Sequence, residues 1–361
     1  MTAPARILVT GATGAVGSAV QRALDAAGHD TYGVSRRGGT GARQYAWRIG
    51  QEAAPDALRG PWPVVVHCAA DTRWNLPTER AAEANITPLR ALLSTIGPET
   101  HFIHLSSSYV TGLNGTSDSS APDAYRNSYE WSKAAAERLV RAERESADIV
   151  RFPIVIGARS DGRLDRYSGF FWLPSSLCSG AVPALVAEGK ALLDMVSTDD
   201  VADHIVRTVA GGPPSDHRLA VLGRGDRAQR VDEVFDTILD ALNSWRAEAG
   251  VPRLDHLPYV TPDQWNRFYL PFAEQYLDRA QLVRVTAFRA YQGYLSVTEP
   301  FAVTDQVADT AQVLHRSIRR WGGGGGAGPR PPPPPGGGGG GPRPPPLMCP
   351  RTASASSTTT A

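Results

Sequence analysis

The sequence has few of the features that mark secreted, membrane-spanning or nucleic-acid-binding proteins. Its 361 residues include only three cysteines, Cys68, Cys178 and Cys349, which excludes a disulfide framework and predicts reduced thiols. The formal charge of +1 offers no attraction to nucleic acid or to an anionic membrane. No apolar run approaches the roughly 20 residues that span a bilayer, and no signal peptide precedes the first strand-like segment. We therefore expect a soluble, cytoplasmic protein.

Lysine is almost absent. Of the 37 basic residues only Lys133 and Lys190 are lysine, and the others are arginine. Such a bias is typical of a GC-rich coding sequence, so a lysine that persists is a candidate for a functional role.

The end of the chain differs in composition from everything before it. In residues 322–361, glycine and proline occupy 23 of 40 positions. Apolar side chains there are too few to offset the entropy of ordering, so residues 321–361 are predicted to be a disordered tail. Its polyproline runs could also form extended ligands for SH3-like or WW-like partners.

Residues 1–160 alternate between strand and helix patterns, which predicts an α/β fold with a doubly wound, Rossmann-type parallel sheet. We expect this dinucleotide-binding core to be completed by segments near 190–223, and residues 161–320 to form mainly a substrate-binding cap. The predicted strands are 7–10, 29–35, 64–67, 101–105 and 149–156, and the predicted helices are 16–27, 81–96, 129–145 and 231–242.

A glycine-rich turn joins the first predicted strand to the first predicted helix. Gly11, Gly14 and Gly17 have the spacing GxxGxxG, which permits a tight turn and places the free N–H groups of a helix against a pyrophosphate. The alternative is a turn with a structural role only. The predicted cofactor-binding residues in this turn are Thr10, Gly11, Thr13, Gly14, Ala15, Val16 and Gly17.

The end of the second predicted strand indicates which dinucleotide is bound. An acidic residue there would bind the 2′-hydroxyl of NAD, whereas arginine accommodates the 2′-phosphate of NADP. The sequence has Ser35, Arg36 and Arg37 and no carboxylate. We therefore expect NADP(H) rather than NAD(H), with Arg36 as the main phosphate ligand. The alternative is a solvated basic turn.

Tyr129 and Lys133 lie four residues apart, on one face of a predicted helix. An ammonium beside a phenol favours the phenolate, so we expect the pKa of Tyr129 to fall below about 10 and the phenol to act as an acid or base. The alternative is a surface tyrosine beside an exposed lysine. Upstream, Ser106, Ser107 and Ser108 follow a predicted parallel strand, at the edge where such sheets bind ligands. A serine there could hydrogen-bond a carbonyl oxygen as charge develops on it, or simply form a turn.

In order and spacing, these motifs resemble the extended short-chain dehydrogenase/reductases. The glycine turn resembles the family's TGxxGxxG, His67–Asp71 its HxAA segment, Leu105–Gly112 its SSxxVxG strand end, and Tyr129–Lys133 its YxxxK. Further matches are Asn85, Arg151–Gly157 (RPxxVxG) and Val196–Val201 (DDVA). The segments AADTRW and SSSYVTG are most similar to the thioester-reductase and male-sterility branch.

The resemblance implies a catalytic role for four residues. Tyr129 would be the proton donor, Lys133 would tune it and hold the nicotinamide ribose, Ser107 would polarise the carbonyl, and Asn85 would support a proton relay. Ser107 is preferred to Ser108 by its offset from Gly112. The further cofactor contacts implied are Cys68, Ala69, Ala70, Phe152, Pro153 and Ile154, beside Tyr129 and Lys133.

The chain departs from the family pattern at two places. Residues 48–50 contain no aspartate to hold the adenine, and Pro88 follows Asn85 where glycine is common.

Other candidates have simpler explanations. His101 and His104 are three apart on a strand and face opposite sides, so they cannot chelate one metal, and no metal is expected. Asp199 and Asp200 are interpreted as helix caps, and Cys68 as a buried thiol. Two clusters of aromatic residues are candidates to line the substrate pocket, and the alternative is that they only pack in the core. The first is Phe170, Phe171 and Trp172, and the second is Tyr259, Trp265, Tyr269 and Phe272.

Three functions compete. The favoured one is an NADPH-dependent reductase of an aldehyde, ketone or thioester, with a small-molecule substrate of hydrophobic acyl or polyketide-like character. The others are an NAD-retaining sugar-nucleotide epimerase and a non-catalytic nucleotide-sensing protein. Arg36 favours the first, and the Ser107, Tyr129 and Lys133 set argues against the last. The protein could act alone or as a homodimer.

Overall fold

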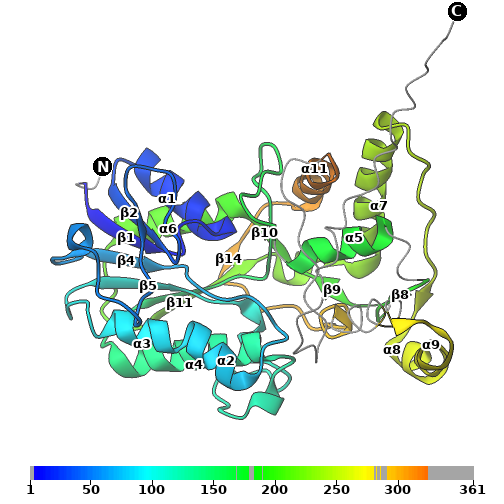
Figure 1. The fold of residues 1–361 in the computed structure, drawn as a ribbon, viewed down its shortest axis with the longest axis horizontal. Helices are drawn as coiled ribbons and strands as arrows, with labels where there is room; N and C mark the ends of the chain where they lie inside the picture. The colour runs from blue at the N-terminus through cyan, green and yellow to red at the C-terminus, as the bar shows by residue number, and fades with distance from the viewer. Residues whose placement is uncertain are drawn as a thin grey trace, which may run out of the picture.

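The computed structural model describes residues 4–323 apart from 168, 179–182, 189, 280–281, 283–284 and 286–290. The predicted tail and Cys349 lie outside the described residues. An eight-stranded parallel sheet forms the centre, in the order β14-β11-β6-β5-β4-β1-β2-β3 (Figure 1). Its strands are β1 Arg6–Thr10, β2 Asp30–Ser35, β3 Gln44–Ala46, β4 Val64–His67, β5 His101–Leu105, β6 Asp148–Arg151, β11 Arg218–Gly223 and β14 Asp305–Gln306.

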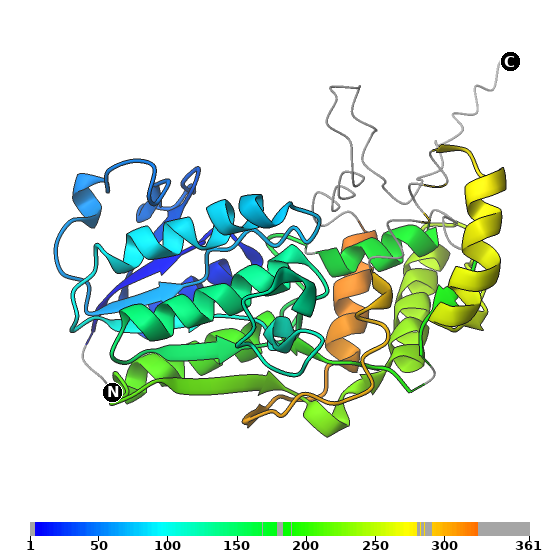
Figure 2. The same cartoon turned by 90° about the horizontal axis from the view of Figure 1, so that it is seen from below.

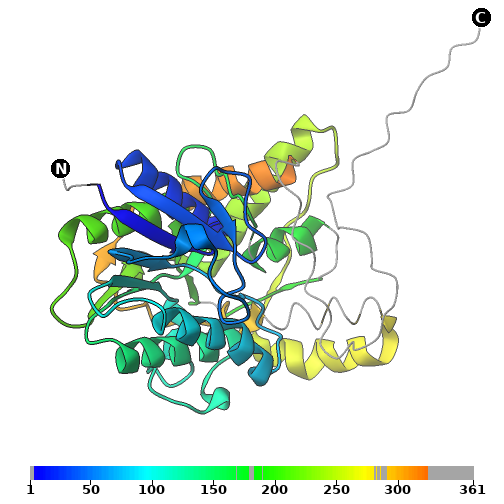
Figure 3. The same ribbon diagram turned by 60° about the vertical axis from the view of Figure 1, so that its left-hand side comes forward.

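Helices cover both faces of this sheet, which confirms the predicted doubly wound α/β fold. Helices α1 and α6 pack together on one face, and α2, α3 and α4 lie on the other (Figures 1 and 3). Because both faces are covered, the central strands are apolar throughout, as in the fully buried β4. The bounds are α1 Ala15–Ala26, α2 Thr78–Asn85, α3 Thr87–Leu93, α4 Ser128–Glu143 and α6 Thr198–Gly211.

The helix predicted over 81–96 is instead two helices, α2 and α3. They meet at Ile86, and Pro88 stands in the first turn of α3. Proline lacks the N–H that a continuous helix would need at that point, but it is well accommodated in the first turn of a new helix. The prediction was wrong at this joint because it followed the apolar periodicity and passed over the proline.

The strand predicted over 149–156 is likewise two strands. β6 ends at Arg151, and β7 (Ile154–Ile156) leaves the central sheet to pair with β10 (Met195–Ser197). Pro153 stands in the gap, and it has no N–H to donate to a ladder. The break turns residues 152–155 toward the carboxyl edge of the sheet, where they reach the site described below.

A second region packs beyond the carboxyl edge around its own apolar core, which includes Phe171, Ile238, Leu242 and Trp265. Figure 2 shows α7, α11 and α5 beside the sheet and the yellow helices α8 and α9 farthest from it. No described helix is long and apolar enough to cross a membrane. The helices are α5 Trp172–Cys178, α7 Val231–Glu248, α8 Pro262–Gln264, π-helical η6 Trp265–Tyr269, α9 Leu270–Tyr276 and α11 Ala311–Gly322.

Short elements complete the second region. Two small ladders join β8 (Leu185–Val186) to β13 (Tyr259–Val260), and β9 (Leu192–Leu193) to β12 (Gln229–Arg230). Besides the return near 190–223, the chain enters the central sheet once more at β14. The 3-10 turns are η1 Asp56–Leu58, η2 Ser108–Thr111, η3 Pro122–Ala124, η4 Gly169–Phe171 and η5 Gly225–Arg227.

Candidate active site

The strand order reverses between β1 and β4, and two connected cavities open at the carboxyl ends of these strands. This is the position at which open α/β sheets bind ligands, because the connections to the two neighbouring strands run in opposite directions there. One cavity has a volume of about 400 Å³ and the other about 890 Å³. Every site residue predicted from the sequence lines one or both of them.

The glycine turn lies where the two cavities meet. Gly11 has φ +69°, and a Cβ atom there would come within 2.8 Å of the Ala69 backbone, so only glycine fits. The N–H of Gly14 donates to the Gly11 carbonyl at 2.8 Å and closes the turn. Helix α1 then begins with no side-chain cap and no acidic residue in its first turn. Its free N–H groups and positive dipole end are therefore open to an anion, so the residues present fit a dinucleotide pyrophosphate.

Four arginines line the smaller cavity, and three of them are Arg36, Arg37 and Arg48. Arg36 and Arg37 follow β2, and Arg48, which the sequence analysis did not select, lines both cavities beside them. The Arg36 side chain is 71% exposed, and its nearest acidic oxygen, on Asp71, lies at 4.0 Å. Asp71 instead pairs closely with Arg73, at 2.7 Å. Arg36 therefore remains available to a ligand phosphate.

The loop after β4 forms the floor shared by the two cavities. Cys68 and Ala70 line both, and Ala69 lines the smaller one. The loop is fixed from below, since the Thr10 hydroxyl lies 2.8 Å from His67 Nδ1 and accepts the N–H of Ala69 at 3.3 Å. Burial raises the pKa of the Cys68 thiol to about 12, so this cysteine stays protonated and acts as a small apolar group.

Asn85 secures the same loop from helix α2. Its side-chain oxygen accepts the N–H of Asp71 at 2.6 Å, and its amide donates to the Asp71 carbonyl at 3.0 Å and to Ser132 at 2.9 Å. Both amide hydrogens are thus engaged, one by the loop backbone and one by the Ser132 hydroxyl. The contacts support a positioning function for Asn85, and the proton relay implied by the resemblance stays a prediction.

Helix α4 carries Tyr129 and Lys133 to the wall of the larger cavity, one turn apart. The helix begins at a favourable cap, because the Asn127 side chain accepts the N–H of Glu130 at 3.0 Å. The i,i+4 spacing places both side chains on one helical face, and that face is turned toward the carboxyl edge of the sheet. The predicted pair is therefore present as a local unit.

The pKa of the Tyr129 phenol is raised to about 12, and the prediction that it falls is wrong for this state of the chain. Burial is the main cause, and the neighbouring Glu130 carboxylate adds to it. The amine that was expected to lower this pKa is engaged elsewhere: Lys133 Nζ donates to the Leu105 carbonyl at 2.6 Å and lies 3.3 Å from His104 Nε2. At neutral pH the phenol carries its proton, which is the form that a proton donor needs.

Lys133 is itself buried among groups that oppose its charge. Burial lowers the pKa of its amine to about 8, although Glu137 acts in the opposite direction. The two imidazoles beneath it, His67 and His104, stack with ring centres 5.5 Å apart. Burial followed by the positive charge of Lys133 lowers the pKa of His67 to about 3 and that of His104 well below its usual range. Both histidines are therefore neutral, and the amine is the positive group at this depth.

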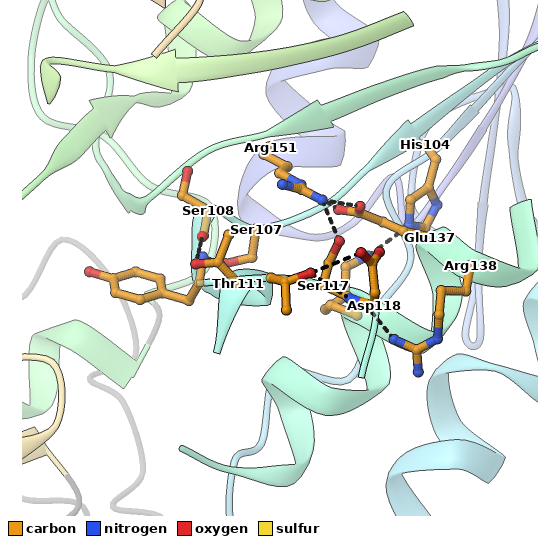
Figure 4. A network of polar contacts seen from close by, with 12 residues as sticks. His104, Ser107, Ser108, Thr111, Ser117, Asp118, Glu137, Arg138 and Arg151 are labelled. Atoms are coloured by element: carbon orange, nitrogen blue, oxygen red, sulfur yellow. Dashed lines mark hydrogen bonds and ion pairs between the residues drawn. The ribbon is translucent and has the colours of Figure 1, made fainter. Parts of the chain in front are cut away.

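The three serines after β5 have different surroundings. Ser107 lines the larger cavity, and its hydroxyl accepts the N–H of Tyr109 at 3.3 Å, which leaves its own hydrogen free for a ligand. The Ser108 hydroxyl is buried without a partner among the described residues, and Ser108 lines neither cavity (Figure 4). Ser106 also lines the larger cavity, but its hydroxyl is buried. The geometry favours Ser107 as the hydrogen-bond donor to a substrate oxygen.

This difference gives a matched pair of variants. Ser107→Ala removes a donor aimed into the cavity and is expected to lower kcat by about 100-fold. Ser108→Ala removes a buried hydroxyl that has no partner, so kcat is expected to stay within about twofold. Steady-state kinetics on both variants distinguish the two serines, and an equal loss in both would contradict the assignment.

Aromatic side chains form the far wall of the larger cavity. They are Trp74, Tyr109, Tyr167, Phe170, Tyr291 and Tyr294. Trp74 packs edge-on against Tyr291 with ring centres 4.5 Å apart, and Tyr109 against Tyr294 at 4.8 Å. Of the aromatics proposed from the sequence for the substrate pocket, Phe170 alone lines a described cavity. Phe171, Trp172 and Trp265 are core residues, whereas Tyr259 and Phe272 are exposed. The wall was missed because its members come from distant segments.

The candidates given simpler explanations have ordinary partners. His101 forms a hydrogen bond with Asp148, with 2.7 Å between its Nε2 and the Asp148 Oδ2. Asp200 forms a capping box with Ser197 at the start of α6, which confirms its interpretation as a cap. Among the described residues no cluster of three histidine, cysteine or carboxylate side chains could hold a metal ion.

Comparison with known proteins agrees with this geometry. Residues 7–217 match the model of the NAD dependent epimerase/dehydratase family, which spans the glycine turn, the serine turn and the Tyr129–Lys133 pair. The chain belongs to this family. It is therefore an enzyme of the extended short-chain dehydrogenase/reductase kind, and its cofactor is a nicotinamide dinucleotide.

Three further relatives are informative. Methionine adenosyltransferase 2 subunit beta from Danio rerio is 31% identical over 163 residues, which cover 42% of this chain and 48% of that protein, so the chain spans about half its length. The terminal R domain of the myxalamid PKS-NRPS pathway shares the fold with a TM-score of 0.62, 18% identity and 90% and 92% coverage of the two chains. RMD from Pseudomonas aeruginosa, complexed with NADPH, has a TM-score of 0.54, 17% identity and 87% and 98% coverage.

Proposed function

We propose that this family member is an NADPH-dependent reductase of a carbonyl compound, an aldehyde, ketone or thioester. The observation that carries the proposal is the placement of Ser107, Tyr129 and the glycine turn around one continuous space, with Arg36 at its outer end. A chain built on this plan can hold a dinucleotide along the carboxyl edge and a carbonyl beside its nicotinamide. The cytoplasm remains its expected location.

Each side chain then has a task in the reduction. NADPH, when bound, supplies the hydride that forms the new C–H bond and becomes NADP⁺. Ser107 donates a hydrogen bond to the carbonyl oxygen, and the protonated phenol of Tyr129 gives its proton to that oxygen as the C=O π-bond breaks. Lys133, one helical turn away, is proposed to stabilise the phenolate left behind, which requires its amine to leave the Leu105 carbonyl. Lys133 is proposed to hold the nicotinamide ribose as well.

The walls of the larger cavity indicate the substrate class. The cavity that Tyr129 lines is also lined by Trp74, Tyr109 and Tyr294, together with Leu173, Leu193 and Leu295. Such a surface suits an apolar or aromatic acyl group better than the many hydroxyls of a sugar. The proposal therefore names a hydrophobic, polyketide-like carbonyl compound as substrate.

The cofactor decides between this proposal and an epimerase. The purified protein is denatured and any released nucleotide is identified, and fresh protein is then titrated with NADPH and NADH by fluorescence. An empty site with a clear NADPH preference supports the reductase, because its cofactor leaves after each turnover. Stoichiometric retained NAD would replace the proposal by an epimerase that returns the hydride to the same substrate.

Arg36 provides the sharper test. Arg36→Asp exchanges the phosphate ligand for a carboxylate that suits a 2′-hydroxyl, so we expect NADPH to bind about 100-fold more weakly while NADH loses little. Arg267→Asp changes the charge equally at an exposed position of η6, and it should alter neither affinity. Equal losses for the two cofactors in the Arg36 variant would show that this guanidinium does not read the 2′-phosphate.

A further inference from the structure

A loop that begins at the last residue of the Arg151–Gly157 motif reaches both cavities. It leaves β7, covers residues 157–167 and returns to the second region at η4. The loop is anchored at both ends. At its start the Gly157 N–H donates to the Ser317 hydroxyl at 3.0 Å, and near its end Leu164 and Tyr167 are buried. The loop is closed within itself by the Ala158 N–H donating to the Arg163 carbonyl at 2.9 Å. Its backbone is therefore held in place.

Asp165 fastens this loop to the first two turns of helix α1. Its carboxylate accepts the Ser18 hydroxyl at 2.7 Å and the Arg22 guanidinium at 2.5 Å, and Arg163 on the loop itself adds a bond at 3.0 Å. Although partial burial opposes ionisation, these donors lower the pKa of Asp165 to about 2. The carboxylate thus stays charged across the physiological range, and the loop stays on the helix that opens at the glycine turn.

Arg166, the next residue, lines both cavities and is exposed. Gly11, Gly14 and Arg36 also line both cavities, so Arg166 lies where the two cavities meet. It has no ion-pair partner within the described part of the chain, in contrast to Arg22 and Arg163, which Asp165 engages. Its positive charge is therefore left for a ligand.

We infer that Arg166 binds the diphosphate that joins the two halves of the dinucleotide, from the side opposite the N-terminus of α1, and that Asp165 holds the loop for this purpose. The inference rests on the proposed function, because it requires a dinucleotide that spans both cavities. A diphosphate at their junction meets the helix N–H groups on one side and a guanidinium on the other. Arginine suits this position, since its planar fork binds two phosphate oxygens together.

Cofactor binding tests the inference without any substrate. NADPH and NADH are titrated against the full chain and against Arg166→Gln by fluorescence and by calorimetry. Because the diphosphate is common to the two cofactors, both affinities are expected to fall by the same factor, about tenfold or more. Arg166→Lys keeps a point charge, so its affinity for each cofactor should lie between the affinities of the unaltered chain and of Arg166→Gln. Arg267→Gln removes an exposed charge that lines neither cavity, and it should bind both cofactors as the unaltered protein does.

The loop attachment has its own readout. Asp165→Asn weakens the bonds to Ser18 and Arg22 without touching the cofactor, so we expect a smaller loss of both affinities and faster limited proteolysis within residues 157–167. Wild-type affinity and proteolysis in this variant would overturn the role of Asp165.

Two results would separate the inference from the proposed function. If the unaltered protein binds neither NADPH nor NADH, the proposed function fails and the inference fails with it. If the unaltered protein binds NADPH and Arg166→Gln binds it equally well, the inference alone is overturned. A loss of UDP binding with unchanged cofactor binding would also overturn it, by assigning Arg166 to a substrate diphosphate.

Discussion

Tyr129→Phe is expected to lower kcat for carbonyl reduction by about 10³-fold while it leaves the affinity for NADPH within about twofold. The phenol pKa of about 12 keeps the proton on its oxygen at neutral pH, so the side chain is ready to donate. Phenylalanine retains the ring that packs in the cavity wall and removes only the hydroxyl. The loss should therefore appear in the chemical step and not in cofactor binding.

A second tyrosine provides the control for this variant. Tyr125 precedes α4, is buried, and its hydroxyl donates to the Ser119 carbonyl at 2.8 Å, but it lines neither cavity. Tyr125→Phe should cost a hydrogen bond, about 1 kcal/mol of stability, and leave kcat nearly unchanged. Single-turnover measurements of NADPH oxidation with an aldehyde compare the two variants. Normal turnover in Tyr129→Phe would remove this residue from the mechanism.

Glu137→Ala is expected to destabilise the fold by about 3–5 kcal/mol, because it leaves a buried arginine without its counter-charge. Arg151 on β6 donates to Glu137 on α4 through two bonds of 2.9 and 2.6 Å, and to the Ser117 hydroxyl at 2.9 Å (Figure 4). Glu137 is 1% exposed and Arg151 is 9% exposed. This pair ties the helix that carries Tyr129 to the sheet.

Thermal and urea unfolding measure the effect. A loss of this size lowers the Tm of a domain this large by about 10 °C. Replacing both partners by apolar residues, Glu137→Leu with Arg151→Met, should recover most of the stability, since no charge then remains buried alone. If Glu137→Ala were as stable as the unaltered chain, solvent would have to reach Arg151 freely. If the double variant were no better than Glu137→Ala, packing rather than charge would explain the loss.

The parts of the site that the sequence predicted are those made by neighbours along the chain. The glycine motif occupies seven consecutive residues, Gly11–Gly17, from the end of β1 into the first turn of α1, and each conformation there depends on adjacent residues. Tyr129 and Lys133 share a helical face because a helix places residues four apart on the same side. The buried strands β4 and β5 were predicted at their observed bounds from short apolar runs.

Predictions failed where a segment pairs or packs with a distant part of the chain. At Pro153 the strand pattern continues, yet β7 leaves the central sheet because Met195–Ser197 offers it another partner. The aromatic wall brings Trp74 against Tyr291, more than 200 residues away in the sequence. Periodicity describes which face of an element is apolar, but not which distant element will cover it.

The sequence by itself determined the doubly wound fold, the glycine turn and the Tyr129–Lys133 pair, because each is set by local conformation or by the order of strands and helices. Only the tertiary structure decided the state of these groups. Burial raised the pKa of Tyr129, the Leu105 carbonyl and His104 engaged Lys133, and the bond from Ser18 to Asp165, across 147 residues, holds the loop from which Arg166 lines both cavities. Desolvation and contacts between remote segments arise only when the chain is packed.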